Sequence, residues 1–213
     1  MQNKFHQIRK DYGRYSLDRD HLHPDPIVQF KQWMNVAVET EQTEPTAMSL
    51  ASVDASGQPS QRIVLMKGIT ERGISFYTNY HSRKGNHFQN HPKASVLFFW
   101  PLMERQVRME GIVEKLPATR SDEYFSTRPR ESQIGAWASP QSEIISNRKI
   151  LEEKFNELKI RFQGQPVPRP PHWGGYLFIP HRMEFWQGGS NRMHDRFEYF
   201  LTQKGWEIRR LAP

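Results

Sequence analysis

The chain has 213 residues, the size of one domain or of one domain with an extension. It contains no cysteine, which excludes disulfides, thiolate catalysis and cysteine-ligated metals. The net charge of +7 favours anionic partners, and the basic residues are dispersed, often beside glycine or an aromatic residue. We therefore expect discrete anion pockets more than a continuous surface for a polyanion.

The sequence carries no signal for a membrane or for export. No apolar run approaches the roughly 18 residues that a membrane span requires. The first 15 residues lack an apolar core and are only modestly rich in arginine, so we expect neither a secretory signal nor a transit peptide. The default expectation is a cytoplasmic protein.

The N-terminal part is expected to hold an arm and a helix. Residues 1–20 are polar and predict a flexible arm or a short helix, whereas residues 21–213 predict one domain. The stretch "DPIVQFKQWMNVAVET" predicts a helix, because Asp25 suits the N-cap position and Pro26 the first helical position. The apolar stripe of this helix is expected to consist of Ile27, Phe30, Met34 and Val38.

The remainder predicts short strands with inserted helices. A short polar helix ends before Pro92, two short helices are separated by Pro129, and a long amphipathic helix is expected within 142–162. The expected strands cover 47–54, 60–68, 74–79, 93–100, 104–116, 174–186, 193–202 and 206–210. This order predicts a mainly β fold with flanking helices, a β-barrel with helices at its side.

The familiar short motifs of catalysis are absent. No GxGxxG, GxxxxGK[ST] or GxSxG pattern occurs, and the spacing of histidines and acids does not favour a metal site. The chemistry must therefore be sought in clusters of basic and aromatic residues.

Two clusters lie in the first half of the chain. Arg62 and Lys67 bracket an apolar strand, which could simply be a strand with charged ends. Arg83 and Lys84 begin a helix, where the helix dipole disfavours cations unless an anion such as phosphate binds there. The alternative for this second cluster, which also includes Tyr77 and Thr78, is a solvated loop.

A third cluster is expected around Pro129. Tyr124 and Arg128 lie four residues apart on one helical face, and Ser132 follows the proline, so the three could converge on a phosphate. The alternative is a surface helix that stops at a proline. Gln141 and Ser142 come next, and for Ser142 the plainer interpretation is a cap of the long helix.

The fourth cluster follows the Gly188-Gly189 turn signal. If this run is a strand, Arg192, His194 and Arg196 share one face, with Met193 and Phe197 on the other. The alternative is a face exposed to water. The nearby aromatic residues argue for partial burial, and buried basic groups need anions. Together the clusters could hold two phosphates and a ring system.

Several of these stretches resemble one family. The segments "QRIVLMKG", "FYTNYHSRKG", "RQVRMEG", "YFSTRPRESQIGAWAS", "FWQGG", "RMHDRF" and "RRLAP" occur in the order found in pyridoxamine 5'-phosphate oxidases. The resemblance implies an FMN-binding split β-barrel. It also implies a homodimer with two FMN sites at the subunit interface, each built from both chains.

The activity that the resemblance implies is the oxidation of pyridoxine 5'-phosphate or pyridoxamine 5'-phosphate to pyridoxal 5'-phosphate. Hydride would pass from substrate C4' to flavin N5. O2 would reoxidise the flavin and yield hydrogen peroxide, and the amine substrate would also release ammonia. Nucleic acid and membrane partners are not implied.

The resemblance also assigns residues. The FMN site would take Arg62, Ile63, Val64, Leu65, Met66, Lys67, Tyr77, Thr78, Arg83, Lys84, Gln106, Gln141, Ser142, Trp186 and Arg196. The substrate site would take Lys67, Tyr124, Arg128, Ser132, Arg192, Met193 and His194, with Arg9, Lys10, Asp11 and Tyr12 from a closing N-terminal segment. Arg192 and His194 would orient the substrate and tune its proton state.

The assignment of Arg62 and Lys67 to one site sets a geometric condition. The two are five residues apart, so a regular strand would send them to opposite faces. We therefore predict a break in the strand near Met66 to Gly68.

Two other functions remain open. A different split-barrel flavoprotein, such as a flavin reductase or a flavin-storing protein, would not need the second phosphate pocket. A nucleic-acid-binding barrel would need a continuous basic groove and would show salt-sensitive affinity.

Overall fold

The computed structural model describes residues 5–7, 11–40 and 43–213. In this part of the chain nine strands form one sheet in which every pairing is antiparallel, and helices flank it, which confirms the mainly β class. The strands are β1 (Ala47–Val53), β2 (Pro59–Leu65), β3 (Gly68–Thr70), β4 (Gly73–Asn79), β5 (Lys93–Trp100), β6 (Arg105–Lys115), β7 (Trp173–Gln187), β8 (Asp195–Thr202) and β9 (Gly205–Leu211). The helices are α1 (Pro26–Thr40), α2 (Arg83–Asn90), α3 (Ala118–Ser126), α4 (Arg130–Ala138) and α5 (Lys149–Arg161), with short 3-10 turns η1 (Phe5–Gln7), η2 (Arg19–His21) and η3 (Ser190–Arg192). None of the described helices is long and apolar enough to cross a membrane.

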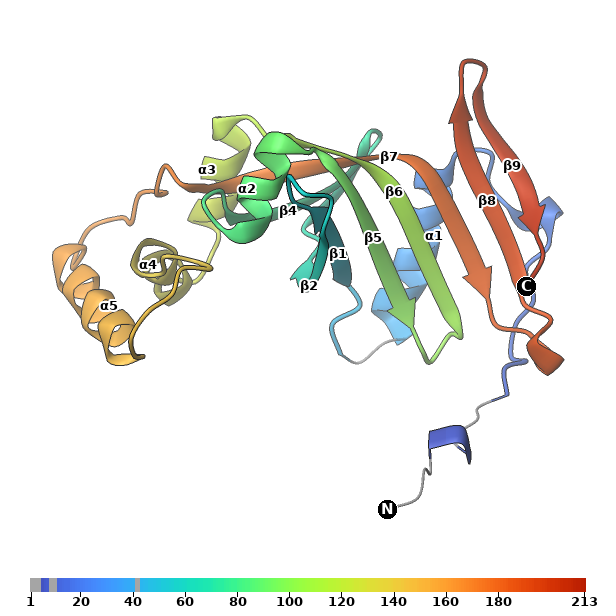
Figure 1. The fold of residues 1–213 in the computed structure, drawn as a ribbon, viewed down its shortest axis with the longest axis horizontal. Coiled ribbons are helices and arrows are strands. Elements are labelled where there is room, and N and C mark those ends of the chain that lie inside the picture. Colours follow the sequence, from blue (N-terminus) through green and yellow to red (C-terminus); the bar gives the residue numbers. More distant parts are fainter. Residues whose placement is uncertain (1–4, 8–10, 41–42) are drawn as a thin grey trace.

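The long strand β7 connects the two ends of the molecule. The sheet runs β2-β1-β5-β6-β7-β4-β3, and the β8–β9 hairpin pairs with the second half of β7. The first half of β7 pairs with β4. Pairing with β6 shifts register between Glu110 and Gly111, close to Pro180, and such an irregularity bends a sheet. Figure 1 shows the resulting curl, with α3 to α5 near one end of β7 and β8–β9 at the other.

The sheet nearly closes on itself at two residues. Met66 and Lys67 separate β2 from β3, which lie at opposite ends of the strand order. The Met66 N–H donates to the Thr46 carbonyl at 2.9 Å, and the Lys67 N–H donates to the Ser75 carbonyl at 2.8 Å. The predicted break near Met66 to Gly68 is therefore confirmed.

Helix α1 packs its apolar side onto the sheet. The Phe30 ring lies 5.0 Å from Phe98, and the Trp33 ring lies 5.2 Å from Phe185 in an edge-to-face arrangement. The predicted stripe was wrong at its last position, because Val38 is 56% exposed while Ala37 is buried. The helical period of 3.6 residues turns Val38 away from the face that Phe30 and Ala37 share.

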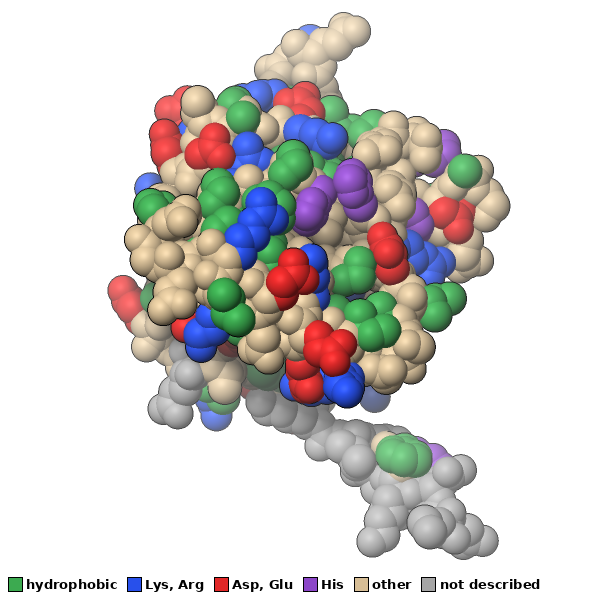
Figure 2. Space-filling view, turned by 90° about the vertical axis from the view of Figure 1, so that its left-hand side faces the viewer, with side chains coloured by type: hydrophobic (Ala, Val, Ile, Leu, Met, Phe, Trp, Pro, Cys, Tyr) green, Lys and Arg blue, Asp and Glu red, His purple; other side chains and the backbone are tan. Residues whose placement is uncertain are grey.

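Helix α5 is shorter than the sequence predicts. It begins at Lys149, and Ser142 lies in a separate turn with φ of 76°, so the interpretation of Ser142 as a cap was wrong. Instead, the Asn147 Oδ1 accepts the Ile150 N–H at 3.4 Å. Leu158 is buried, whereas Ile160 is exposed. Figure 2 views this end of the molecule and shows hydrophobic side chains at the surface among charged ones.

The N-cap of α1 gives a test of the local energetics. The Asp25 Oδ1 accepts the Ile27 N–H at 2.7 Å, as the sequence predicted. Asp25→Ala should lower the free energy of unfolding by about 1 kcal/mol, measured by urea denaturation. Glu39→Ala, an exposed change at the other end of the helix, should alter it by less than about 0.5 kcal/mol. Equal losses in the two variants would contradict a capping role for Asp25.

Candidate functional site

A cavity of about 670 Å³ lies between β2, β4, the start of α2 and the corner formed by α3. We call it the cation pocket. It gathers a large part of the predicted site: Arg62, Ile63, Val64, Leu65, Lys67, Tyr77, Thr78, Arg83, Lys84, Tyr124, Arg128, Gln141 and Ser142. Met66 lies in the hydrophobic core instead. Ser132 lines an adjoining cavity of about 280 Å³ that Arg128 and Gln141 also line.

The start of α2 forms one side of the cation pocket. Ser82 caps the helix, and Arg83 and Lys84 are its first two residues. The buried Lys84 donates from Nζ to Thr78 Oγ1 and to Ser82 Oγ, both at 3.0 Å. Burial, together with the nearby charge of Arg62, lowers the pKa of Lys84 to about 8. Both causes penalise the positive charge, and a bound anion would relieve that penalty.

Arg62 faces the same corner from β2. Its guanidinium donates to the Leu50 carbonyl at 3.1 Å and to Ser52 Oγ at 2.7 Å. Burial and then the charge of Arg83 lower the pKa of Arg62. Among the described residues, the ion pairs include no carboxylate bound to the basic residues of this pocket: Arg62, Lys67, Arg83, Lys84 and Arg128. The pocket therefore holds concentrated positive charge that an anion can neutralise.

A stack of aromatic rings forms another part of the pocket wall. Tyr77 stacks on Tyr124 with ring centroids 4.0 Å apart, and Trp173 lies 5.6 Å from Tyr77. The guanidinium of Arg128 lies 4.6 Å from the Trp173 ring. Its Nη1 is buried and has no hydrogen-bond partner, and burial lowers the pKa of Arg128. Arg128 is thus a second point in the pocket where an anion would be stabilised.

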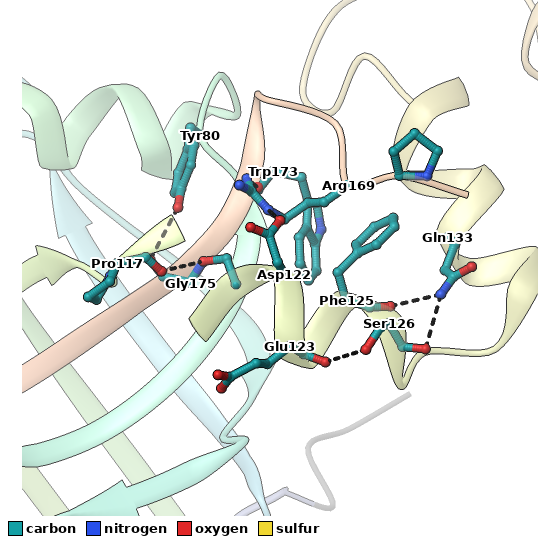
Figure 3. Close-up of polar contacts among 12 residues, drawn as sticks. Tyr80, Pro117, Asp122, Glu123, Phe125, Ser126, Gln133, Arg169, Trp173 and Gly175 are labelled. Carbon is teal, nitrogen blue, oxygen red and sulfur yellow. Dashed lines mark hydrogen bonds and ion pairs between the residues drawn. The ribbon is translucent and has the colours of Figure 1, made fainter. Parts of the chain in front are cut away.

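The corner that carries Tyr124 and Arg128 is fixed by polar contacts (Figure 3). Gln133 of α4 donates from Nε2 to the carbonyls of Phe125 at 2.9 Å and Ser126 at 3.3 Å, which ties α4 to the end of α3. Arg169 pairs with Asp122 at 2.6 Å and donates to the Trp173 carbonyl at 2.7 Å. These contacts connect α3, α4 and the start of β7.

Trp173 was not singled out from the sequence. It lines both cavities and is 7% exposed. Its stretch looked like the end of a proline-rich loop. The tryptophan followed by Gly174 and Gly175 was the available signal, because a paired glycine allows a close approach of neighbouring side chains. An added Cβ at Gly174 would lie 2.0 Å from the Tyr80 hydroxyl.

A second group of predicted residues lies at the far end of β7. We call Trp186, Arg192, His194 and Arg196 the β7-end cluster. The His194 ring lies 4.6 Å from Trp186, and its Nδ1 accepts the Gly189 N–H at 3.1 Å. In the neutral ring this hydrogen bond leaves the proton on Nε2.

The expected strand through Arg192, His194 and Arg196 was partly wrong. Strand β8 begins only at Asp195, and Arg192 lies in η3 with φ of 64°. Asn191 is also left-handed, with φ of 55°, and the Met193 N–H closes the turn on the Ser190 carbonyl. The side chains before Asp195 therefore do not alternate between the two faces of a strand.

Side-chain exposure in the cluster follows from this turn. Met193 is 70% exposed whereas Phe197 is buried, so the two do not share a face as expected. Arg196 does lie in the strand, where it pairs with Glu184 at 2.8 Å and donates to the Ala212 carbonyl at 2.7 Å. The hydrogen bond to Glu184 raises the pKa of Arg196.

Other predicted residues surround the β7-end cluster. Gln106 of β6 pairs in register with Trp186. The Tyr12 ring lies 5.7 Å from Trp186 and 6.1 Å from His194, and exposed Asp11 precedes it. Arg9 and Lys10 lie outside the described residues.

One chain does not bring its two groups of predicted residues together. Trp173 lines the cation pocket at the first position of β7, and Trp186 belongs to the β7-end cluster near its last. A strand rises about 3.3 Å per residue, so up to about 40 Å of strand separates them. Figure 1 shows the two ends of β7 on opposite sides of the molecule. A single ligand can touch both groups only if they come from different copies of the chain.

A further cavity of about 560 Å³ lies between α4, α5 and the end of β4. Its lining includes Glu143, Glu153 and Glu157. Besides two histidines, the lining has one lysine, Lys154, which is already paired with Glu157. This acidic lining disfavours a phosphate. In the described part of the chain no three histidine or acidic side chains gather closely enough to hold a metal ion.

Two family models together match most of the chain. The model described as pyridoxamine 5'-phosphate oxidase matches residues 34–162, and the model described as the pyridoxine 5'-phosphate oxidase C-terminal dimerisation region matches residues 173–213. The chain belongs to the pyridoxamine 5'-phosphate oxidase family. The resemblance drawn from the sequence is therefore confirmed, and the chain is an oxidoreductase.

Curated relatives match over nearly their whole length. A pyridoxine/pyridoxamine 5'-phosphate oxidase of Salinibacter ruber is 49% identical, over 99% of this chain and 100% of its own. The enzyme of the same name from Neisseria meningitidis serogroup C is 49% identical, over 98% of this chain and 99% of its own. One of Burkholderia mallei is 50% identical, over 97% of each chain.

Solved structures confirm the split-barrel fold class. PhzG from Burkholderia lata, in complex with tetrahydrophenazine-1-carboxylic acid, superposes with a TM-score of 0.89 at 30% identity, over 94% of this chain and 99% of its own. A pyridoxamine 5'-phosphate oxidase-related, FMN-binding protein of Nostoc punctiforme has a TM-score of 0.69 at 16% identity, over 93% and 100%. The second likeness concerns the fold alone.

The match to a dimerisation region bears on assembly. It covers β7, β8 and β9, including the β7-end cluster, and it supports a homodimer. A second copy is also what the separation along β7 requires if the cation pocket and the β7-end cluster act on one ligand.

The depressed pKa of Lys84 gives a prediction about stability and pH. In the ligand-free protein the pKa of Lys84 is about 8, against 10.5 for an ordinary lysine. Between these two values the unfolded chain binds the proton that the native chain has lost, so stability rises with pH across this window. In phosphate-free buffer, the unfolding free energy of the wild type relative to Lys84→Met should therefore increase from pH 8 to pH 10.5. A difference that stays flat with pH would contradict the buried, unneutralised charge.

Proposed function

We propose that this chain catalyses the FMN-dependent oxidation of pyridoxine 5'-phosphate or pyridoxamine 5'-phosphate to pyridoxal 5'-phosphate, a step of vitamin B6 metabolism. The observation that carries the proposal is the cation pocket, which has two separate cationic points. Lys84 with Arg62 lies at the start of α2, and Arg128 lies against Trp173. Two phosphate monoesters, one on the cofactor and one on the substrate, match these two points. The names of the relatives at 49–50% identity agree with this chemistry.

The residues present fit FMN. The cofactor's phosphate would neutralise Arg62 and Lys84, whose charges burial and a neighbouring positive charge now penalise, and would also meet the adjacent Arg83. Arg62 and Arg83 suit this role because a planar guanidinium can bond two phosphate oxygens. Once bound, FMN would supply the acceptor for the hydride from substrate C4' and would pass the electrons to O2, which gives hydrogen peroxide.

The second cationic point would bind the substrate's phosphate. Arg128 offers a buried Nη1 without a hydrogen-bond partner, and the Tyr124 and Ser132 hydroxyls lie on the same corner. Lys67 lines the pocket from the break between β2 and β3, where it can meet the same ligands as Arg62. Fixing the phosphate would hold the substrate ring at one distance from the flavin.

The β7-end cluster of a second copy would complete the site. The Gly189 N–H holds the His194 ring through Nδ1, so the neutral imidazole presents Nε2–H as a donor. Arg192 is exposed, and the described ion pairs give it no carboxylate. We propose that these two groups orient the pyridine ring and control the protonation of its substituents, and that Trp186, Gln106 and Arg196 contribute to the flavin's surroundings.

The substrate class needs a direct test, because PhzG of the same fold was solved with a carboxylic acid. The flavin absorbance of the purified holoprotein should bleach on anaerobic addition of pyridoxamine 5'-phosphate and return with air. Unphosphorylated pyridoxamine, which cannot engage Arg128 through a phosphate, should bleach it far more slowly. Equal rates for the two would contradict a substrate-phosphate pocket.

Two substitutions should separate the cofactor and substrate roles. Arg192→Ala should lower kcat/KM for pyridoxamine 5'-phosphate roughly ten- to hundredfold while FMN stays bound, because it removes a charged contact to the substrate. Lys84→Ala should weaken FMN affinity by a similar factor, measured by fluorescence titration of the ligand-free protein. Loss of FMN from the first variant, or unchanged FMN affinity in the second, would reverse these assignments.

A further inference from the structure

Glu104 lies in the turn between β5 and β6. We propose that Glu104 is a positioning residue that fixes the N-terminal arm, residues 11–17, on the β7-end cluster and so holds Tyr12 against Trp186 and His194. The functional consequence of this inference rests on the proposed function.

The carboxylate of Glu104 is the anchor. Its Oε2 accepts the Gly13 N–H at 2.9 Å and the Arg14 N–H at 3.2 Å, two consecutive amides of the arm. Glu104 is 2% exposed. Hydrogen bonds from amides to a carboxylate are stronger than those between neutral groups, and burial shields them from water. The carboxylate of Glu104 thus binds the arm, which lies about 90 residues earlier in the sequence.

The backbone of Glu104 joins the same junction to β7. Its carbonyl accepts the Gly188 N–H at 2.7 Å and the Gln187 Nε2–H at 3.1 Å. Glu104 also has φ of 55°, a conformation that glycine adopts without strain and glutamate does not. Because the turn alone would favour glycine, we attribute the presence of glutamate here to the bonds that its side chain forms with the arm.

The arm fits closely against the loop that carries the cluster. An added Cβ at Gly188 would lie 2.7 Å from the Tyr12 Cβ, and one at Gly13 would lie 2.8 Å from Ser190 Oγ. Ser190 Oγ donates to the Tyr12 carbonyl at 3.1 Å. The arm and the loop therefore leave no space for an added methyl group, and this fit requires the arm to keep one position relative to the loop. Glu104 forms hydrogen bonds with both segments.

The position of Tyr12 links this anchor to the reaction. Tyr12 contacts Trp186 edge-to-face at 5.7 Å and lies 6.1 Å from His194. A second anchor, from the Leu17 N–H to Asp195 Oδ2 at 3.0 Å, fixes the arm further along, whereas Glu104 bonds the two residues that directly follow Tyr12. If Glu104 releases Gly13 and Arg14, the site should lose a wall on the substrate side, and the FMN phosphate contacts should stay intact.

The anchor can be measured without reference to activity. Hydrogen–deuterium exchange of the holoprotein, read on peptides covering residues 11–17, reports the two amides directly. In Glu104→Gln, whose side chain keeps its size but loses its charge, these amides should exchange roughly tenfold faster than in the wild type. Glu104→Gly keeps the turn, removes the anchor and should show a larger increase. Glu114→Gln, an exposed acid on β6 that pairs with Arg72, is the matched control and should leave the arm unchanged.

The positioning role is measured by kinetics on the same variants. For Glu104→Gln, KM for pyridoxamine 5'-phosphate should rise roughly tenfold, with kcat changed less than about threefold and FMN affinity unchanged. Unchanged exchange in both Glu104 variants would overturn the anchor. Faster exchange with unchanged KM would overturn the positioning role. A wild-type holoprotein that does not oxidise pyridoxamine 5'-phosphate would refute the proposed function, while the exchange measurement would still decide whether Glu104 fixes the arm.

Discussion

The length and direction of one strand determine how the predicted site residues can be brought together. Strand β7 carries Trp173 into the cation pocket at one end and Trp186 into the β7-end cluster at the other. Because a β-strand is extended, the two groups are held far apart within a chain, and no loop movement brings them together. If both groups act on one ligand, as proposed, each chain supplies two half-sites, and pairing of two copies would be part of the chemistry. The match of β7 to β9 with a dimerisation region agrees with this arrangement.

Electrostatics explains why the half-sites need a ligand. The cation pocket sets Arg62, Arg83 and Lys84 close together at the start of α2, where neither a described carboxylate nor the helix dipole offsets their charge. These unneutralised charges lower the stability of the ligand-free protein, and a phosphate bound there would restore it. Arg196 of the β7-end cluster shows the contrast, because its charge is already paired with Glu184 within the chain.

The sequence predicted what depends on local rules and missed what depends on distant contacts. Asp25, the break at Met66 and the basic start of α2 follow from capping, strand alternation and helix polarity, and the structure has all three. The prediction that Arg192 and His194 share one strand face was wrong, because two left-handed residues turn the chain before β8 begins. Glu104 gave no signal, because its partners in the arm lie about 90 residues earlier.

The most direct test of a site shared between two copies is complementation. Arg128→Ala removes a residue of the cation pocket, and Arg192→Ala removes one of the β7-end cluster. Each variant alone should be nearly inactive with pyridoxamine 5'-phosphate. After the two are unfolded together and refolded, mixed dimers should contain one intact site, and activity should recover to about a quarter of the wild-type value. Activity that stays at the level of the separate variants, in a sample shown to contain mixed dimers, would contradict a site built from both chains.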